Sequence, residues 1–331
     1  MDRRGFVRIV GATMTGLRAR PVIDLAQLGR ARRVREDVVD EMDAITAGLR
    51  RLDDGGQGDI LLWSIRAHLH DVVGLIESGS YPDPLGRRLH STAAELLRLA
   101  GWVSFDNGHH AHAQRYWTSA VYTARTAGDH ALSANAIGFL SCQAKDIGRP
   151  QDAVTLAESA LSEYRGTSAG VSAILHLRAA EAHAGAGAIA MCRTEIDAAF
   201  TSLERPHTGT PTWAYWLDRA QAHGQAGYCY LRLAQYTDAR RHLREALRTQ
   251  DPAAIREGAL RNTLLAKTYV RQTDPEVDRA LSHAGAAVAA LSGQASSARC
   301  VGHLTGLLRD LVPYRRRPAV QEFADHLHYL R

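Results

Sequence analysis

The chain has 331 residues, of which 45% are hydrophobic, 6% aromatic and 23% charged, and these proportions are typical of a globular protein. They exclude a largely disordered chain, and no apolar run reaches the length of about 18 residues that a transmembrane helix requires. The formal net charge is +5, and acidic residues are interleaved with the basic ones, so charge alone gives little support for nucleic-acid binding.

The basic residues are almost all arginines. Of the 40 basic residues, only Lys145 and Lys267 are lysines, a skew that indicates high-GC coding bias. The four cysteines form no Cys-x-x-Cys pair and lie among Ala, Leu and Gly in helical patterns. This arrangement predicts reduced, buried thiols and a cytoplasmic location.

The N-terminal segment carries an Arg-Arg pair at Arg3 and Arg4 that is similar to a twin-arginine export signal. The apolar stretch Ile9–Leu17 is short, however, and no A-x-A cleavage site follows it. We expect an arm or linker over residues 1–20 and leave the export signal open as an alternative. Basic residues are densest over 18–35, as an arm or a helix face, and we expect no direct DNA binding through them.

Helical periodicity begins near residue 36 and continues through most of the chain. An N-terminal helical section is predicted over 21–90, with a loop at Ser78–Pro84, where Gly, Ser and Pro cluster. No alternating strand pattern is present, and Asn107-Gly108 is typical of a helix C-terminus followed by a turn. These features predict an all-α protein.

A repeat organises the chain beyond this section. Five segments carry a small residue followed by Ala seven positions later, at offsets of 40, 39, 47 and 41 residues. These pairs are Ala113 and Ala120, Ala153 and Ala160, Cys192 and Ala199, Ala239 and Ala246, and Ala280 and Ala287. A turn position precedes each pair, at Gly108, Gly148, Gly187, Ala234 and Pro275 in order. A small residue precedes each turn position, at Gly101, Ser141, Ala180, Gly227 and Thr268.

The repeat has a physical explanation, because two antiparallel helices approach closely only where small side chains meet. The spacing resembles the tetratricopeptide repeat (TPR), and GYCYLRLAQYTDARRHLREAL at 227–247 is the best match. The resemblance implies five degenerate TPR-like hairpins over 91–310, stacked as a right-handed superhelix (an α-solenoid), with a capping helix in 311–331. The repeat is longer than the usual period of about 34 residues. An insertion at 206–212 accounts for the longest offset.

A narrower resemblance is carried by Asp2–Phe6, Leu99–Asp106 and Gln114–Trp117. These phrases look like the C-terminal sensor region of actinobacterial XRE-type transcriptional regulators. In that family a helix-turn-helix domain precedes the Asp-Arg-Arg-x-Phe phrase, which makes the phrase a linker rather than an export signal. Because this sequence starts at the phrase, we expect no DNA-binding domain in it.

The TPR resemblance implies a concave groove lined by the first helix of each hairpin. Projecting the groove positions onto the repeats gives the predicted ligand-binding residues Glu95, Arg98, Trp102, Phe105, Asn135, Lys145, Glu181, Gln221, Tyr228, Asn262 and Tyr269. Amides suit a peptide backbone, and Arg98 or Lys145 suits a carboxylate. The aromatic residues have core packing between repeats as an alternative interpretation. Trp213–Trp216 is predicted to start a helix, as core or as a contact for a ligand or partner.

Sequence motifs for chemistry are absent. The sequence holds no HExxH or Cys/His zinc spacing, no P-loop and no nucleophile elbow, and His109 with His112 is most simply a surface turn. We therefore expect no catalytic residue, metal or cofactor. The expected function is a regulatory or scaffolding module that binds a peptide, a small signal molecule or a partner protein. We expect no association with a membrane, and the sequence leaves open whether the protein forms a homodimer. The alternative is an enzyme, or an accessory protein of specialised metabolism, with its site in the groove.

Overall fold

The computed structural model describes residues 33–54, 58–205, 209–293 and 297–330. Within these ranges the chain forms fourteen α-helices, and its only bridge of β type joins Arg33 and Ser80. The predicted arm over 1–20, its Arg3-Arg4 phrase and most of the basic stretch over 18–35 lie outside the described residues. The all-α prediction is confirmed.

The chain divides into two compact units, each described here by itself. Unit 1 comprises residues up to 53, 57–143 and 155–167. Its helices are α2 (Glu36–Asp54), α3 (Gly58–Ser78), α4 (Asp83–Asp106) and α5 (His110–Ala127), with most of α6 (His130–Asp146) and α7 (Pro150–Glu163).

Unit 2 comprises residues 54–56, 144–154 and 168–331, so it takes the last turn of α6 and the first turn of α7. Its complete helices are α8 (Ala169–Gly185), α9 (Ile189–Leu203), α10 (Arg219–Arg232), α11 (Tyr236–Thr249), α12 (Ile255–Arg271), α13 (Val277–Gly293), α14 (Ala298–Asp310) and α15 (Pro318–His328). Helix α15 lies where the capping helix is predicted, and its capping role stays a prediction. The domain boundaries at residues 90 and 310 stay a prediction.

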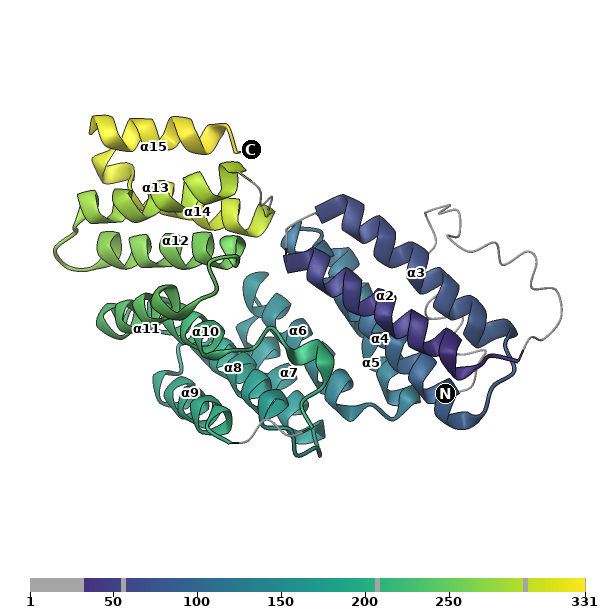
Figure 1. Ribbon diagram of the computed structural model, residues 1–331. Coiled ribbons are helices and arrows are strands. Elements are labelled where there is room, and N and C mark those ends of the chain that lie inside the picture. Colours follow the sequence, from purple (N-terminus) through teal and green to yellow (C-terminus); the bar gives the residue numbers. More distant parts are fainter. Residues whose placement is uncertain (1–32, 55–57, 206–208, 294–296, 331) are drawn as a thin grey trace. The chain divides into compact units, whose positions relative to one another are not determined.

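Consecutive helices pack as antiparallel pairs in both units. Helices α4 and α5 pair in unit 1, and α8 with α9, α10 with α11 and α12 with α13 pair in unit 2 (Figure 1). Within unit 2 the first helices of successive pairs also contact one another, α8 against α10 and α10 against α12. This arrangement is consistent with the predicted helical repeat.

The predicted turn positions share one backbone conformation. Gly108, Gly148 and Gly187 have φ of 79°, 80° and 76°, in the left-handed region that glycine enters without steric cost. Ala234 takes the same role with φ of 56°, and it is the only described residue other than glycine with a positive φ. The fifth position, Pro275, lies in the loop between α12 and α13. The first four repeats therefore turn in the same way.

The small residues of the repeat pack between the paired helices. A Cβ added to Gly227 would lie 2.6 Å from Cγ of Leu243 on the facing helix, and one added to Gly101 would overlap the indole of Trp117. All ten residues of the five spaced pairs are buried. The close approach of helices predicted from the sequence is confirmed.

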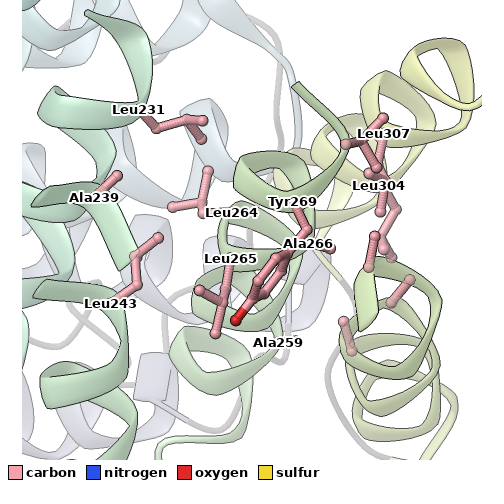
Figure 2. Close-up of a cluster of buried hydrophobic side chains, with 14 of the residues drawn as sticks. Leu231, Ala239, Leu243, Ala259, Leu264, Leu265, Ala266, Tyr269, Leu304 and Leu307 are labelled. Carbon is pink, nitrogen blue, oxygen red and sulfur yellow. The ribbon is translucent and has the colours of Figure 1, made fainter. Parts of the chain in front are cut away.

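The two units have different cores. Phe105, Trp117 and Phe139 form an aromatic cluster in unit 1, where the rings of Trp117 and Phe139 stack with centroids 5.3 Å apart. The core of unit 2 is mainly Ala, Leu and Val from α8 to α15, and Figure 2 shows its part around Leu264 and Leu304. All four cysteines are buried and free, as predicted.

One local prediction is wrong. Trp213–Trp216 does not start an α-helix; Thr212–Ala214 forms a single 3-10 turn, and α10 begins at Arg219. The reason is the cap, because Asp218 accepts a hydrogen bond from the backbone nitrogen of Gln221 at 2.6 Å and fixes the helix start after the aromatic motif. None of the described helices is long and apolar enough to cross a membrane.

Candidate functional site

Three predicted ligand-binding residues meet in unit 2. Lys145 lies in the last turn of α6, Glu181 in α8 and Tyr228 in α10, and α8 and α10 are the first helices of two successive pairs. The ammonium of Lys145 lies 3.4 Å from Oε2 of Glu181 and donates to the hydroxyl of Tyr228 at 3.1 Å. It also lies 4.3 Å from the centre of the Tyr228 ring, within the range of a cation–π interaction. Residues far apart in sequence are thus joined through one ammonium group.

Further charges surround this contact. Lys145 also pairs with Asp146 at 3.0 Å, and Glu181 pairs with Arg178 at 3.2 Å. Burial raises the pKa of Asp146, but the ammonium of Lys145 outweighs it, and the net pKa is lowered. The carboxyl of Asp146 is therefore ionised at neutral pH. Two cations and two anions balance at this end of the cluster.

Helices α12 and α14 add a second lysine and a histidine. The ring of His303 packs edge-on against Tyr228, with centroids 6.1 Å apart. Lys267 is 7% exposed, and its ammonium lies against α14 so closely that a Cβ on Gly306 would be 2.8 Å from Nζ. We call Lys145, Glu181, Tyr228, Lys267 and His303 the lysine cluster.

Electrostatics in the lysine cluster disfavour added positive charge. Burial lowers the pKa of His303 to about 3, with further lowering by Lys267, Arg299 and Lys145. Burial, assisted by Arg271, lowers the pKa of Lys267 to about 8. At neutral pH the imidazole is therefore neutral, and Lys267 still carries its proton.

The predicted residues of unit 1 are held by other parts of the protein. Glu95 forms an ion pair with Arg50 of α2. Arg98 is buried, and its carbonyl oxygen accepts a hydrogen bond from the Trp117 indole at 3.1 Å. Phe105 belongs to the aromatic cluster, against which the half-buried Trp102 packs.

Asn135 differs from these residues. Its side chain is 1% exposed, and neither its amide nitrogen nor its oxygen has a hydrogen-bond partner among the described residues. A buried amide without partners is uncommon, because each unsatisfied group costs about 1 to 3 kcal/mol. The predicted role of Asn135 in binding stays a prediction.

The remaining predicted residues lie in α10 and α12. Gln221 accepts from Arg261 at 2.9 Å, and Asn262 donates to the backbone oxygen of Gly258 at 3.0 Å. Tyr269 is buried, accepts a hydrogen bond from Arg244 and stacks on His283, with ring centroids 5.8 Å apart.

These residues have partners inside the protein, so they are satisfied without a ligand. Sequence reasoning missed Lys267 and His303. Lys267 had a usable signal, since it is one of two lysines in the chain and the other one was selected. His303 had none, because α14 lies beyond the Ala-spaced pairs of the repeat.

No three His, Cys, Asp or Glu side chains of the described residues are grouped as a metal site would require. The rings of His109 and His112 lie 6.0 Å apart at the start of α5. No family model matches the chain, and no curated protein matches it.

Proposed function

We propose that the protein is a regulatory TPR-like binding module, similar to the sensor region of XRE-type regulators, that recognises a small signal molecule or peptide at the lysine cluster. The observation that carries this proposal is the meeting of Lys145, Glu181 and Tyr228, which come from three different helices, α6, α8 and α10. A ligand at this point would act on several repeats at once.

The polar contacts of the cluster support binding better than a purely structural role. Buried ion pairs stabilise a fold weakly, because the loss of hydration offsets most of the Coulomb attraction. Lys145 and Glu181 are each 5% exposed, and a Leu or Met pair of similar volume would fill the space without that cost. A ligand that replaces one partner of Lys145 would alter the contact between α6, α8 and α10, and a partner protein would detect the change.

The proposal is tested with a defined panel of free amino acids, dicarboxylic acids, nucleotides, neutral sugars and short peptides. Thermal unfolding and native mass spectrometry are measured for the wild type and for the double variant Lys145→Met, Glu181→Gln, which removes both charges together. We expect at least one class to raise the melting temperature of the wild type, and not that of the double variant.

The variant Arg88→Gln in unit 1 is the matched control, because it also removes an ion-paired charge but lies outside the cluster. It should retain the ligand response. A ligand response that persists in the double variant, or a panel without any response, would contradict the proposal.

A further inference from the structure

The charges of the lysine cluster are balanced at one end and not at the other. Lys145 has the carboxylates of Asp146 and Glu181 within 3.4 Å. Lys267 forms no hydrogen bond or ion pair with any of the described residues, although it is as buried as Lys145. Burial has removed most of the water around this ammonium, and no acceptor among the described residues replaces it.

The surroundings of Lys267 do not supply the missing anion. Arg271 and Arg309 add positive charge near it, and Asp310, the nearby carboxylate, is engaged in two hydrogen bonds with Arg271 at 2.8 and 3.1 Å. On the side of α14, Nζ of Lys267 lies against Gly306, and the imidazole of His303, three residues earlier on this helix, is neutral. The local excess is therefore positive.

We infer that Lys267, with His303 and Tyr228, binds the oxyanion group of a small ligand, a phosphate or a carboxylate. This inference rests on the proposed function and specifies the chemistry of its ligand. An oxyanion would give the ammonium of Lys267 the charged acceptor that it lacks, and charge-assisted hydrogen bonds of this kind are about twice as strong as neutral ones. The ring of Tyr228 packs against His303 and also against the ammonium of Lys145, so it connects the two ends of the cluster.

The composition of the chain agrees with this assignment. Thirty-eight of the 40 basic residues are arginines, yet both lysines lie in this cluster. A guanidinium is planar and wide, whereas an ammonium is a compact charge with three donors. Nζ lies so close to Gly306 that a Cβ on this residue would be 2.8 Å from it, so the glycine leaves room for the compact ammonium at this point.

The two lysines also make a direct experiment possible. Protein labelled with 13C at lysine Cε gives two side-chain NMR signals, and Lys267→Met identifies the one that belongs to Lys267. Sodium phosphate, sodium succinate and sodium chloride are titrated at matched ionic strength. We expect the Lys267 signal to shift to saturation with phosphate or with succinate, and not with chloride. The anion that produces the shift distinguishes a phosphate site from a carboxylate site.

A pair of glycine variants on α14 supplies the control. Gly306→Ala places a methyl group against the Lys267 ammonium without changing any charge, whereas Gly302→Ala on the same helix meets nothing within 4 Å. We expect Gly306→Ala to weaken anion binding by about 10-fold or more and Gly302→Ala to leave it unchanged.

A Lys267 signal that follows ionic strength alone, or equal binding by both glycine variants, would overturn the inference. If neutral compounds of the ligand panel bind the wild type but neither phosphate nor succinate shifts the Lys267 signal, the oxyanion site is wrong and the proposed binding function is retained. If no compound binds in either experiment, both proposals are wrong.

Discussion

Charged side chains are handled differently at the α2–α4 contact of unit 1 and at the α12–α14 contact of unit 2. In unit 1, α2 and α4 are joined by closed pairs: Arg50 with Glu95, and Arg88 with Asp40 and Asp43 at 2.7 Å each. In unit 2, Lys267 is buried against α14 and forms no ion pair with any described residue. An ion pair holds two helices together, whereas a buried cation without an anion loses hydration free energy that no contact within the fold offsets.

Under the proposed function, this difference separates residues that serve stability from residues that serve recognition. Glu95 and Lys145 are both predicted groove residues, but Glu95 has one dedicated partner, and Lys145 shares its ammonium among Asp146, Glu181 and Tyr228. Removing a residue of the first kind should lower stability. Removing Lys267 should raise it, at the expense of binding.

The largest effect is expected in unit 1 for Glu95→Gln. The substitution removes the Glu95 carboxylate that pairs with the guanidinium of Arg50, whose side chain is 9% exposed. A buried pair that loses one partner costs about 3 kcal/mol, so urea unfolding should show a loss of this size.

The matched control is Asp40→Asn. The Asp40 side chain is 61% exposed, and Arg88 keeps its contact with Asp43, so the loss should be about 1 kcal/mol or less. Equal losses for the two variants would show that the α2–α4 pairs are not what holds unit 1 together.

Lys267→Met should have the opposite sign. Methionine fills a similar volume and removes the buried ammonium, so we expect a gain of about 1 to 3 kcal/mol at pH 7. The pKa of Lys267 is lowered from 10.5 to about 8, so the unfolded chain holds its proton more tightly than the folded one. The gain should be complete below pH 8 and should disappear as the pH rises toward 10.5.

Denaturant unfolding of the wild type and of the variant at pH 7 and pH 10 checks this prediction. Subtracting the free energy of unfolding of one protein from that of the other at each pH cancels the contribution of the other titrating groups. A variant that is less stable than the wild type at pH 7 would mean that Lys267 has an internal partner and that the contrast between the units is wrong.

The sequence predicted the fold mainly through its small residues. Small residues at fixed offsets specify where helices touch, as at Gly227 against Leu243, and this pattern is local enough to read without coordinates. The groove projection selects one face of each first helix and says nothing about side-chain partners. It selected Lys145 and Tyr228 of the lysine cluster, but it could not tell that Asn262 is already bonded to His283 at 2.9 Å. Lys267 and His303 depend on the packing of α12 against α14, which no repeat position encodes.

The smallest expected effect concerns the turns, where both units follow the same rule with one exception. Gly108 in unit 1 and Gly148 in unit 2 have φ of 79° and 80°, but Ala234 holds φ of 56° with a Cβ. A residue with a side chain costs about 1 kcal/mol more than glycine in the left-handed conformation. Glycine at this position offsets part of that difference, because it loses more backbone entropy on folding. Ala234→Gly should therefore stabilise unit 2 by about 0.5 kcal/mol.

The reverse changes at the regular turns test whether the two units share this rule. Gly108→Ala and Gly148→Ala each introduce a Cβ at positive φ with open space around it, so steric contact with neighbours does not contribute. Each should cost about 1 kcal/mol, a cost that thermal unfolding should detect as a lower melting temperature. If Gly108→Ala costs much more than Gly148→Ala, the turn in unit 1 carries a constraint beyond backbone conformation. If all three variants leave stability unchanged, the repeat is specified by the helix contacts alone, and its glycines mark where the chain turns without holding it there.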